Sequence, residues 1–125
     1  MNVKELTQLV EATMKRGSPA YSTPSGAFLE LLRRFASERN LVAFADACSL
    51  YASAHPNTST FIAARVPGIL CNCYFTVLPG FDYERFIQWS LENKGWQEQL
   101  IESYASPADL QKVVQSICTS VGKST

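Results

Sequence analysis

The residues of this sequence best suited to chemistry are its cysteines and its histidine. The chain has four cysteines and one histidine: Cys48, Cys71, Cys73, Cys118 and His55. Cys71 and Cys73 form a C-x-C spacing rather than the C-x-x-C of redox and zinc motifs, and a zinc site would need the distant cysteines to converge. A catalytic thiol paired with His55 would need a lowered pKa, but the cysteines stand among apolar residues, which raise the pKa of a thiol. We therefore expect four small buried thiols, no metal site and no catalytic residue.

Other catalytic patterns are missing from the sequence. It contains no glycine-rich phosphate loop, no nucleophile elbow and no metalloprotease motif. His55 precedes Pro56 at the end of a predicted helix, where a partly positive ring is favourable beside the terminal carbonyl groups. Glu98 and Glu102 share one face of another predicted helix, but the Glu-x-x-His partners of a carboxylate metal site are missing, which indicates a solvated face. The sequence therefore predicts a protein that is not an enzyme and has no cofactor.

One cluster of basic residues has the chemistry to meet phosphate. Arg33, Arg34 and Arg39 stand close together, with Glu30 and Glu38 interleaved. Mixed charges at this spacing are typical of a solvated helix face or of a contact with another protein. A nucleic-acid-binding module that uses the three arginines is the alternative. It is disfavoured because the chain has 11 basic and 11 acidic side chains and a net charge of zero, whereas such modules bind by neutralising phosphates.

The composition predicts one folded domain. The length of 125 residues is that of a single domain, and the hydrophobic content of 46% excludes disorder as a description of the whole chain. Charged residues make up only 18%, which indicates that some of the surface is not meant to face solvent. Charges interrupt the first sixteen residues, and the most apolar stretch, residues 66–81, is too short to span a membrane. We therefore expect a cytoplasmic protein without a membrane segment.

Apolar residues recur at helical spacing along almost the whole chain, and capping residues divide the pattern into helices. The expected helices cover about residues 3–16, 24–36, 41–54, 58–78, 82–92, 96–104 and 107–121. A flexible loop is expected at about 17–22 and a tail at 122–125. Pro67 removes one backbone hydrogen bond, so we expect a kink or break near Val66. The predicted fold is an all-α, single-domain bundle of six to seven short helices around a central apolar helical hairpin.

The predicted central hairpin consists of the segments 41–54 and 58–78. Each is apolar on every side and carries a single charge, Asp46 in the first and Arg65 in the second. Helices that are apolar all round are normally buried all round. Because a short turn joins the two segments, we expect antiparallel neighbours in which Arg65 and Asp46 form a buried ion pair.

The segment 82–92 raises the question of a partner. Tyr83, Phe86, Ile87 and Leu91 form the apolar stripe that should face the core, and Trp89 lies roughly opposite. Trp89 then faces solvent, a partner or a second element of the same domain, of which the contact within the domain is the preferred interpretation. Tryptophan is enriched at the energetically dominant positions of interfaces.

Three functions remain open from the sequence. The first is a small, non-enzymatic protein-binding factor, such as an adaptor, an inhibitor, an immunity-type protein or a regulator. It would form a homodimer or a hetero-complex through Trp89, Leu78, Arg33 and Arg34. The second is a small-ligand binder or enzyme with a pocket near the Pro67 kink, which a polar cavity at Arg65, Asn72 and Tyr74 would favour. The third is the nucleic-acid module that uses Arg33, Arg34 and Arg39.

Overall fold

All the elements in the part of the chain that the structure describes are helices. This computed structural model describes residues 1–16, 22–103 and 106–121, without the side chains of Ser59, Ala63 and Ile101. The elements are α1 (Val3–Met14), α2 (Pro24–Ser37), α3 (Leu41–Ala54), the 3-10 helix η2 (Pro56–Thr58), α4 (Ser59–Ile69), the π-helix η3 (Leu70–Phe75), α5 (Tyr83–Glu92), α6 (Trp96–Glu102) and α7 (Pro107–Val121). The loop expected at 17–22, apart from its last residue, and the tail at 122–125 lie outside the described residues.

Side-chain caps determine where the helices begin, as the sequence predicts. A side-chain oxygen of the residue before each helix accepts a hydrogen bond from a backbone N–H of its first turn. The bonds run from Glu5 to Asn2 (2.9 Å), from Gly26 to Thr23 (3.1 Å), from Ala43 to Asn40 (3.1 Å) and from Arg85 to Asp82 (3.2 Å). These four caps confirm the predicted starts of α1, α2, α3 and α5.

The all-α, single-domain bundle is confirmed, and α2 lies at its centre. Phe28 and Leu32 of α2 are fully buried, and Leu31 is 1% exposed. The helix packs against α1, α3, α4 and η3. The two segments of the expected central hairpin both contact α2, and their contact with each other is smaller than either of these. The long aliphatic and aromatic side chains of α2 therefore fill the space that the sequence assigned to the hairpin.

Neither α3 nor α4 is buried on every side, contrary to the prediction. Val42 of α3 is 63% exposed and Phe61 of α4 is 41% exposed. Much of the rest of the exposed side of α4 is made by small residues, such as Ala64 and Gly68. Isolated exposed apolar side chains of this kind are common on soluble domains, so an apolar sequence on all sides did not require complete burial here.

The predicted ion pair between Arg65 and Asp46 does not form. Arg65 is exposed, and its guanidinium carbon lies 5.1 Å from the centroid of the Phe61 ring. Asp46 instead lies 3.5 Å from the amino group of Met1. The prediction was wrong because it assumed that α3 and α4 are packed neighbours, whereas each packs mainly on other elements.

Pro67 does not break its helix. The α4 helix continues through Pro67 to Ile69, and the π-helix η3 follows directly. At the end of η3, the Thr76 N–H donates to the Cys71 carbonyl, five residues earlier, at 3.3 Å. The backbone therefore changes its hydrogen-bond register three residues after the proline rather than breaking at Val66. This widened turn buries Leu70, Tyr74 and Phe75 and leaves Asn72 exposed.

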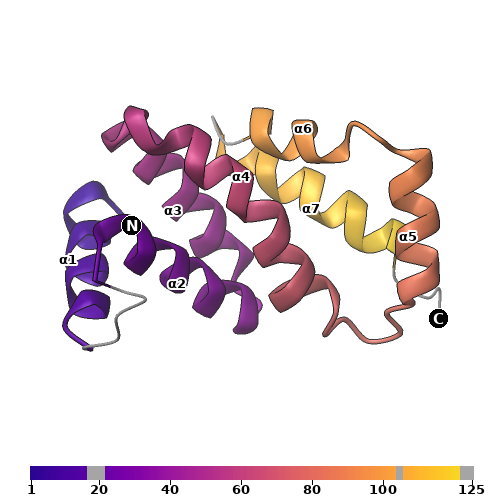
Figure 1. The fold of residues 1–125 in the computed structure, drawn as a ribbon, viewed down its shortest axis with the longest axis horizontal. Helices are drawn as coiled ribbons and strands as arrows, with labels where there is room; N and C mark the ends of the chain where they lie inside the picture. Colours follow the sequence, from indigo (N-terminus) through magenta and orange to yellow (C-terminus); the bar gives the residue numbers. More distant parts are fainter. Residues whose placement is uncertain (17–21, 104–105, 122–125) are drawn as a thin grey trace.

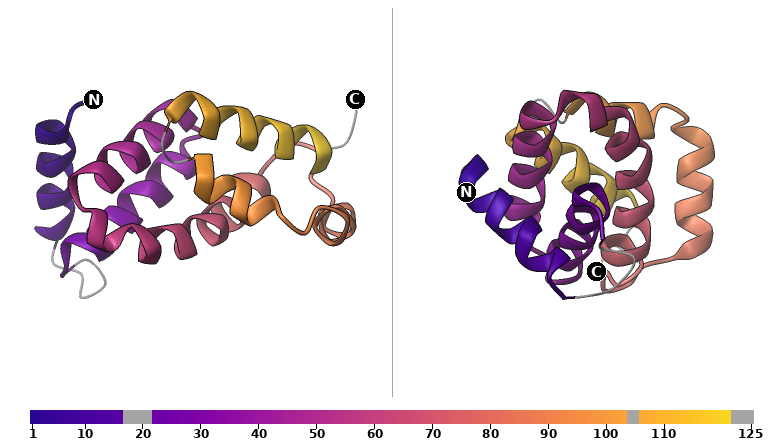
Figure 2. Two further views of the ribbon diagram at one scale, coloured as in Figure 1. Left: turned by 90° about the horizontal axis from the view of Figure 1, so that it is seen from above. Right: turned by 60° about the vertical axis from the view of Figure 1, so that its left-hand side comes forward.

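The helices form an elongated bundle with α1 at one end and α5 at the other (Figure 1). In the turned views, α5 stands beside the bundle rather than within it (Figure 2). Its main helix-to-helix contact is with α7. No helix in the described ranges has the length and apolar character needed to cross a membrane.

Candidate functional site

The outward side of α5 carries an apolar surface that no described element covers. Tyr83 is 65% exposed, Ile87 41% and Leu91 66%, and we call these three residues the outer stripe. They are spaced four residues apart, so they lie on one side of the helix. The prediction that this side faces the core was wrong. Of the predicted stripe, only Phe86 is turned inward, where it packs against the core together with Trp89.

Aromatic rings attach α5 to the rest of the bundle. The ring centroids of Phe86 and Trp96 lie 5.9 Å apart, and those of Trp89 and Trp96 lie 5.6 Å apart. Phe86 also lies 6.2 Å from Phe75 of η3 and 6.0 Å from Phe81. Rings at these separations attract one another beyond the burial of their surface. Trp89 therefore makes the second intramolecular contact that was the preferred sequence interpretation. The large ring of Trp89 is packed inward, and the smaller side chains of Ile87 and Leu91 face outward.

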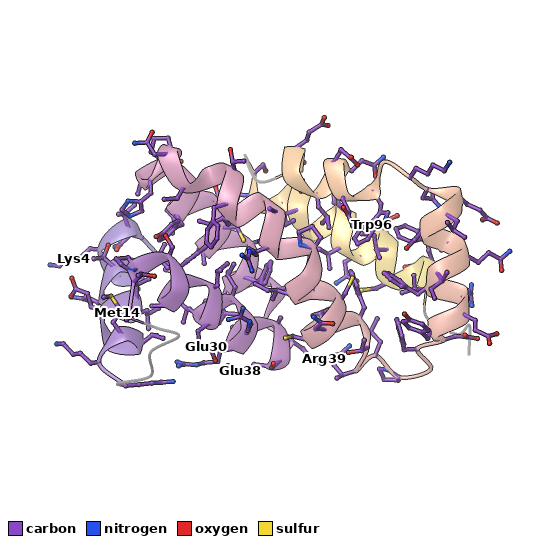
Figure 3. The ribbon with its side chains drawn as sticks, viewed as in Figure 1. Lys4, Met14, Glu30, Glu38, Arg39 and Trp96 are labelled. Atoms are coloured by element: carbon purple, nitrogen blue, oxygen red, sulfur yellow. The ribbon has the colours of Figure 1, made fainter. Side chains whose placement is uncertain are left out.

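A cavity lies where α5 meets α6 and α7, and we call it the α5–α7 cavity. Its volume is about 530 Å³. Figure 3 shows the side chain of Trp96 in the region between α6, α7 and α5. The lining residues are Trp89, Glu92, Asn93, Lys94, Gly95, Trp96, Gln99, Lys112, Val113, Ser116, Ile117 and Ser120. The cavity thus combines two indole rings with charged and hydrogen-bonding groups.

The charge of the cavity is predominantly positive. Lys94 and Lys112 line it, and Glu92 is its one acidic residue. Within the described part of the chain, neither ammonium group has a carboxylate within 4.0 Å. The carboxylate of Glu92 accepts a hydrogen bond from the Gln88 amide at 3.4 Å. The two lysines therefore face the cavity without an acidic partner.

The other residues predicted for partner binding do not gather at one surface. Leu78 is half-buried and packs against the core. Arg33 pairs with Glu30 at 3.3 Å on the exposed side of α2. Arg34 has a buried Nη2 atom for which the described residues supply no hydrogen-bond acceptor. The two neighbouring arginines therefore differ in environment, and neither lies beside the outer stripe in the sequence or in the fold.

Arg39, the third arginine of the basic cluster, is used to join α2 to η3. It adopts a left-handed backbone conformation, with φ of 60°, at the end of α2. Its guanidinium carbon lies 5.2 Å from the Tyr74 ring centroid, and Nη1 donates to the Val77 carbonyl at 3.3 Å. Figure 3 places it at the end of α2 away from α1. These contacts explain why an arginine occupies a position that usually favours glycine.

Burial raises the pKa of three of the four cysteine thiols, Cys48, Cys71 and Cys118. All four are free thiols, but only Cys48 is buried, whereas Cys71, Cys73 and Cys118 are partly buried, so the expectation of four buried thiols was wrong for these three. Burial raises the pKa of Cys48 and raises that of Cys71 to about 11. Burial also raises the pKa of Cys118 to about 11, against the opposing effects of Arg39 and of the Tyr74 hydroxyl beside it. Few thiolates are present at neutral pH under these conditions.

His55 serves as the cap residue of α3, as its position in the sequence indicates. Its backbone N–H donates to the Tyr51 carbonyl at 2.8 Å, and its ring lies 4.5 Å from the Tyr51 ring. A smaller apolar hollow of about 190 Å³ lies beside it, between α1, α2 and α3. Its lining includes Leu6, Val10 and Met14. This hollow offers few polar groups that would fix the orientation of a ligand.

The polar pocket considered near Pro67 does not take the expected form. Arg65 and Asn72 are exposed, whereas Tyr74 is 6% exposed and faces inward. Glu98 and Glu102 are both exposed on α6, in agreement with a solvated face. The α5–α7 cavity was missed by sequence reasoning. The available signal was the polar series Lys112, Ser116 and Ser120, which recurs every four residues along α7.

Comparison with known proteins adds no further assignment. The chain matches no protein-family model, no curated protein and no solved structure. The outer stripe and the α5–α7 cavity are therefore interpreted from their geometry and chemistry.

Proposed function

We propose that this chain is a small protein-binding factor that acts through the outer stripe of α5, and that the stripe binds a second copy of the chain. The observation that supports this is the exposure of Tyr83, Ile87 and Leu91 in a row on a helix whose inward side is already packed. Contiguous exposed apolar surface is a mark of interaction sites. The net charge of zero also leaves no general repulsion between copies.

The arrangement of the outer stripe is self-complementary. Ile87 lies midway between Tyr83 and Leu91. A two-fold axis that passes beside Ile87 and places two copies of α5 antiparallel would pack Ile87 on itself and Tyr83 on Leu91 of the second copy. Residues four apart form the ridges that interlock in the commonest class of helix packing. Closed two-fold dimers are also the commonest protein oligomers.

The charges of α5 are compatible with this pairing. At about 100° per residue, Arg85 and Glu92 project from the side opposite the stripe, and only Glu84 stands next to it. In the antiparallel arrangement Glu84 faces Ser90 of the second copy rather than another carboxylate. A stable interface needs about 1,200 Å² or more in total. A ten-residue helix cannot supply this area by itself, so we expect the contact to extend to Val77, which is 56% exposed and precedes α5.

The central test measures solution mass over a range of protein concentrations. The wild-type chain should approach twice its monomer mass as concentration rises, and Ile87→Glu should remain a monomer. Gln97→Glu is the matched control, because it adds the same charge outside the stripe, in the first turn of α6, where Gln97 is exposed and a negative charge is favourable. Equal masses for the wild type and Ile87→Glu at every concentration would contradict the proposed dimer.

A cross-linking experiment tests the symmetry. Since Ile87 would lie beside its own copy, Ile87→Cys should form an intermolecular disulfide under mild oxidation. Neither Tyr83→Cys nor Leu91→Cys should do so efficiently when used singly, but a mixture of the two variants should. The wild-type chain controls for the four native thiols. Efficient cross-linking by all three single variants would indicate a different arrangement of the helices.

A hetero-complex and a cytoplasmic location belong to the same proposal. If a different protein occupies the stripe, its binding should be lost in Ile87→Glu and kept in Gln97→Glu. The four free thiols are compatible with a reducing compartment. The nucleic-acid alternative receives no support from the arginines, because Arg33 is paired with Glu30 and Arg39 is packed on Tyr74.

A further inference from the structure

We infer that the α5–α7 cavity is a binding site for a small aromatic anion, meaning a planar ring that carries a carboxylate or a phosphate. This site is separate from the outer stripe, because the two occupy different sides of α5. Trp89, on the inward side, lines the cavity, whereas Tyr83, Ile87 and Leu91 do not.

The size and lining of the cavity suit a ring. Its volume of about 530 Å³ falls within the range of known small-molecule pockets, roughly 300–1,000 Å³. Two indole rings contribute to it, with a centroid separation of 5.6 Å and an interplanar angle of 55°. Aromatic rings stack on indoles or meet them edge to face at such separations. Val113 and Ile117 of α7 add an apolar wall opposite.

The charge of the cavity selects an anion. Lys94 lies in the turn between α5 and α6, and Lys112 lies on α7, so two separate elements direct positive charge to the same space. Within the described residues no carboxylate oxygen lies within 4.0 Å of either ammonium group. Ser116 and Gln99 line the same space and are able to donate hydrogen bonds to a carboxylate or phosphate. An anion bound here would meet two opposite charges and one like charge, that of Glu92, whose carboxylate accepts a hydrogen bond from the Gln88 amide.

Gly95 offers a way to block the cavity without changing its charge. A Cβ atom built on Gly95 meets nothing within 4 Å, so a larger side chain there extends into open space rather than into the packed core. Gly95 is itself part of the lining. Gly95→Leu should therefore reduce the volume available to a ligand, and Gly95→Ala should leave most of it free.

Tryptophan fluorescence reports directly on this site. The chain has two tryptophans, Trp89 and Trp96, and both line the cavity. The probes are two matched pairs, 2-naphthoate with 2-naphthylmethanol and adenosine monophosphate with adenosine, together with inorganic phosphate. Fluorescence and titration calorimetry on the full chain should show binding of at least one anionic ring, with the matched neutral ring about tenfold weaker. Which anion binds more tightly distinguishes a carboxylate ligand from a nucleotide.

Variants separate the expected site from non-specific binding. Lys94→Gln and Lys112→Gln should each weaken the binding of the anion about fivefold, as expected for the loss of one charge pair near a protein surface. Each should have little effect on the binding of the neutral ring. Lys4→Gln, a change of an exposed lysine on α1, should have no effect. Gly95→Leu should weaken the binding of both the charged and the neutral ring of a matched pair, whereas Ile87→Glu should weaken the binding of neither. No binding of either anionic ring, or equal affinities for the charged and neutral rings, would overturn the inference.

Discussion

The indole rings of Trp89 and Trp96 lie 5.6 Å apart at an angle of 55°, and this contact joins α5 to α6 across a turn of a few residues. Trp96 is 7% exposed, whereas Trp89 is half-buried. The pair therefore does two things. It orients α5 so that its outer stripe faces away from the bundle, and it provides the aromatic part of the α5–α7 cavity.

Removal of the Trp89 ring should release α5 from the bundle. We expect Trp89→Ala to lower the free energy of unfolding by about 2–4 kcal/mol, because a large half-buried ring and its contacts with Phe86 and Trp96 are lost. Trp89→Phe keeps a ring and should lose about half as much. Urea unfolding followed by circular dichroism measures both. A loss below about 0.5 kcal/mol for the alanine variant would show that the ring contacts do not hold α5.

Two substitutions of Arg39 should separate backbone strain from side-chain contacts. Arg39→Ala loses the contact with the Tyr74 ring and the hydrogen bond to Val77, which should cost about 1–2 kcal/mol. Arg39→Gly loses the same contacts but relieves the cost of φ at 60°, so it should be about 1 kcal/mol more stable than the alanine variant. Thermal or urea unfolding tests this. Equal stability of the two variants would indicate that the left-handed conformation carries no strain.

The exposed position of Arg65 predicts a small effect of its removal. Arg65→Ala should change the free energy of unfolding by about 0.5 kcal/mol or less, because the contact that Arg65 makes among the described residues is the exposed one with the Phe61 ring. A buried ion pair with Asp46 would instead cost about 3–5 kcal/mol when broken. A double-mutant cycle of Arg65→Ala with Asp46→Asn should give a coupling energy near zero. A coupling energy above about 1 kcal/mol would contradict this expectation and support the ion pair that the sequence predicts.

Stability should fall in alkaline solution because partial burial raises the pKa of the Cys118 thiol. Burial raises the pKa of Cys118 from 9.0 to about 11, so the folded chain holds this proton more tightly than the unfolded chain does. The resulting stabilisation is complete below about pH 9 and is lost as the pH rises towards 11. We expect a lower urea midpoint at about pH 10.5 than at about pH 7.5, and a smaller difference in Cys118→Ala. An equal difference in both proteins would contradict a contribution from this thiol.

Local patterns were sufficient to predict the helices. Asn2, Thr23 and Asn40 each cap a helix through a hydrogen bond to a residue three positions later, and such contacts depend only on neighbouring residues. The buried side of α7, with Leu110, Val114 and Ile117, also follows from local spacing. Its apolar residues form a single narrow stripe, so only one orientation buries them.

Helix α5 shows where this reasoning stops. Its apolar residues cover more than half of the helix circumference, so the sequence permits several inward directions. The aromatic residues of η3 and α6, distant from or adjacent to α5 in sequence, select the direction that brings Phe86 and Trp89 inward. The register of η3 after Pro67 also depends on which residues the neighbouring helices bury.

The sequence by itself determined the helices, their caps and the clean apolar stripes, because these rest on interactions between residues a few positions apart. Only the tertiary structure decided that α2 lies at the centre and that Asp46 and Arg65 remain apart. It also decided that α5 presents its outer stripe to the outside and forms the cavity on its inner side. These features depend on which of several distant side chains occupies the same space, and local spacing in the sequence carries no sign of that.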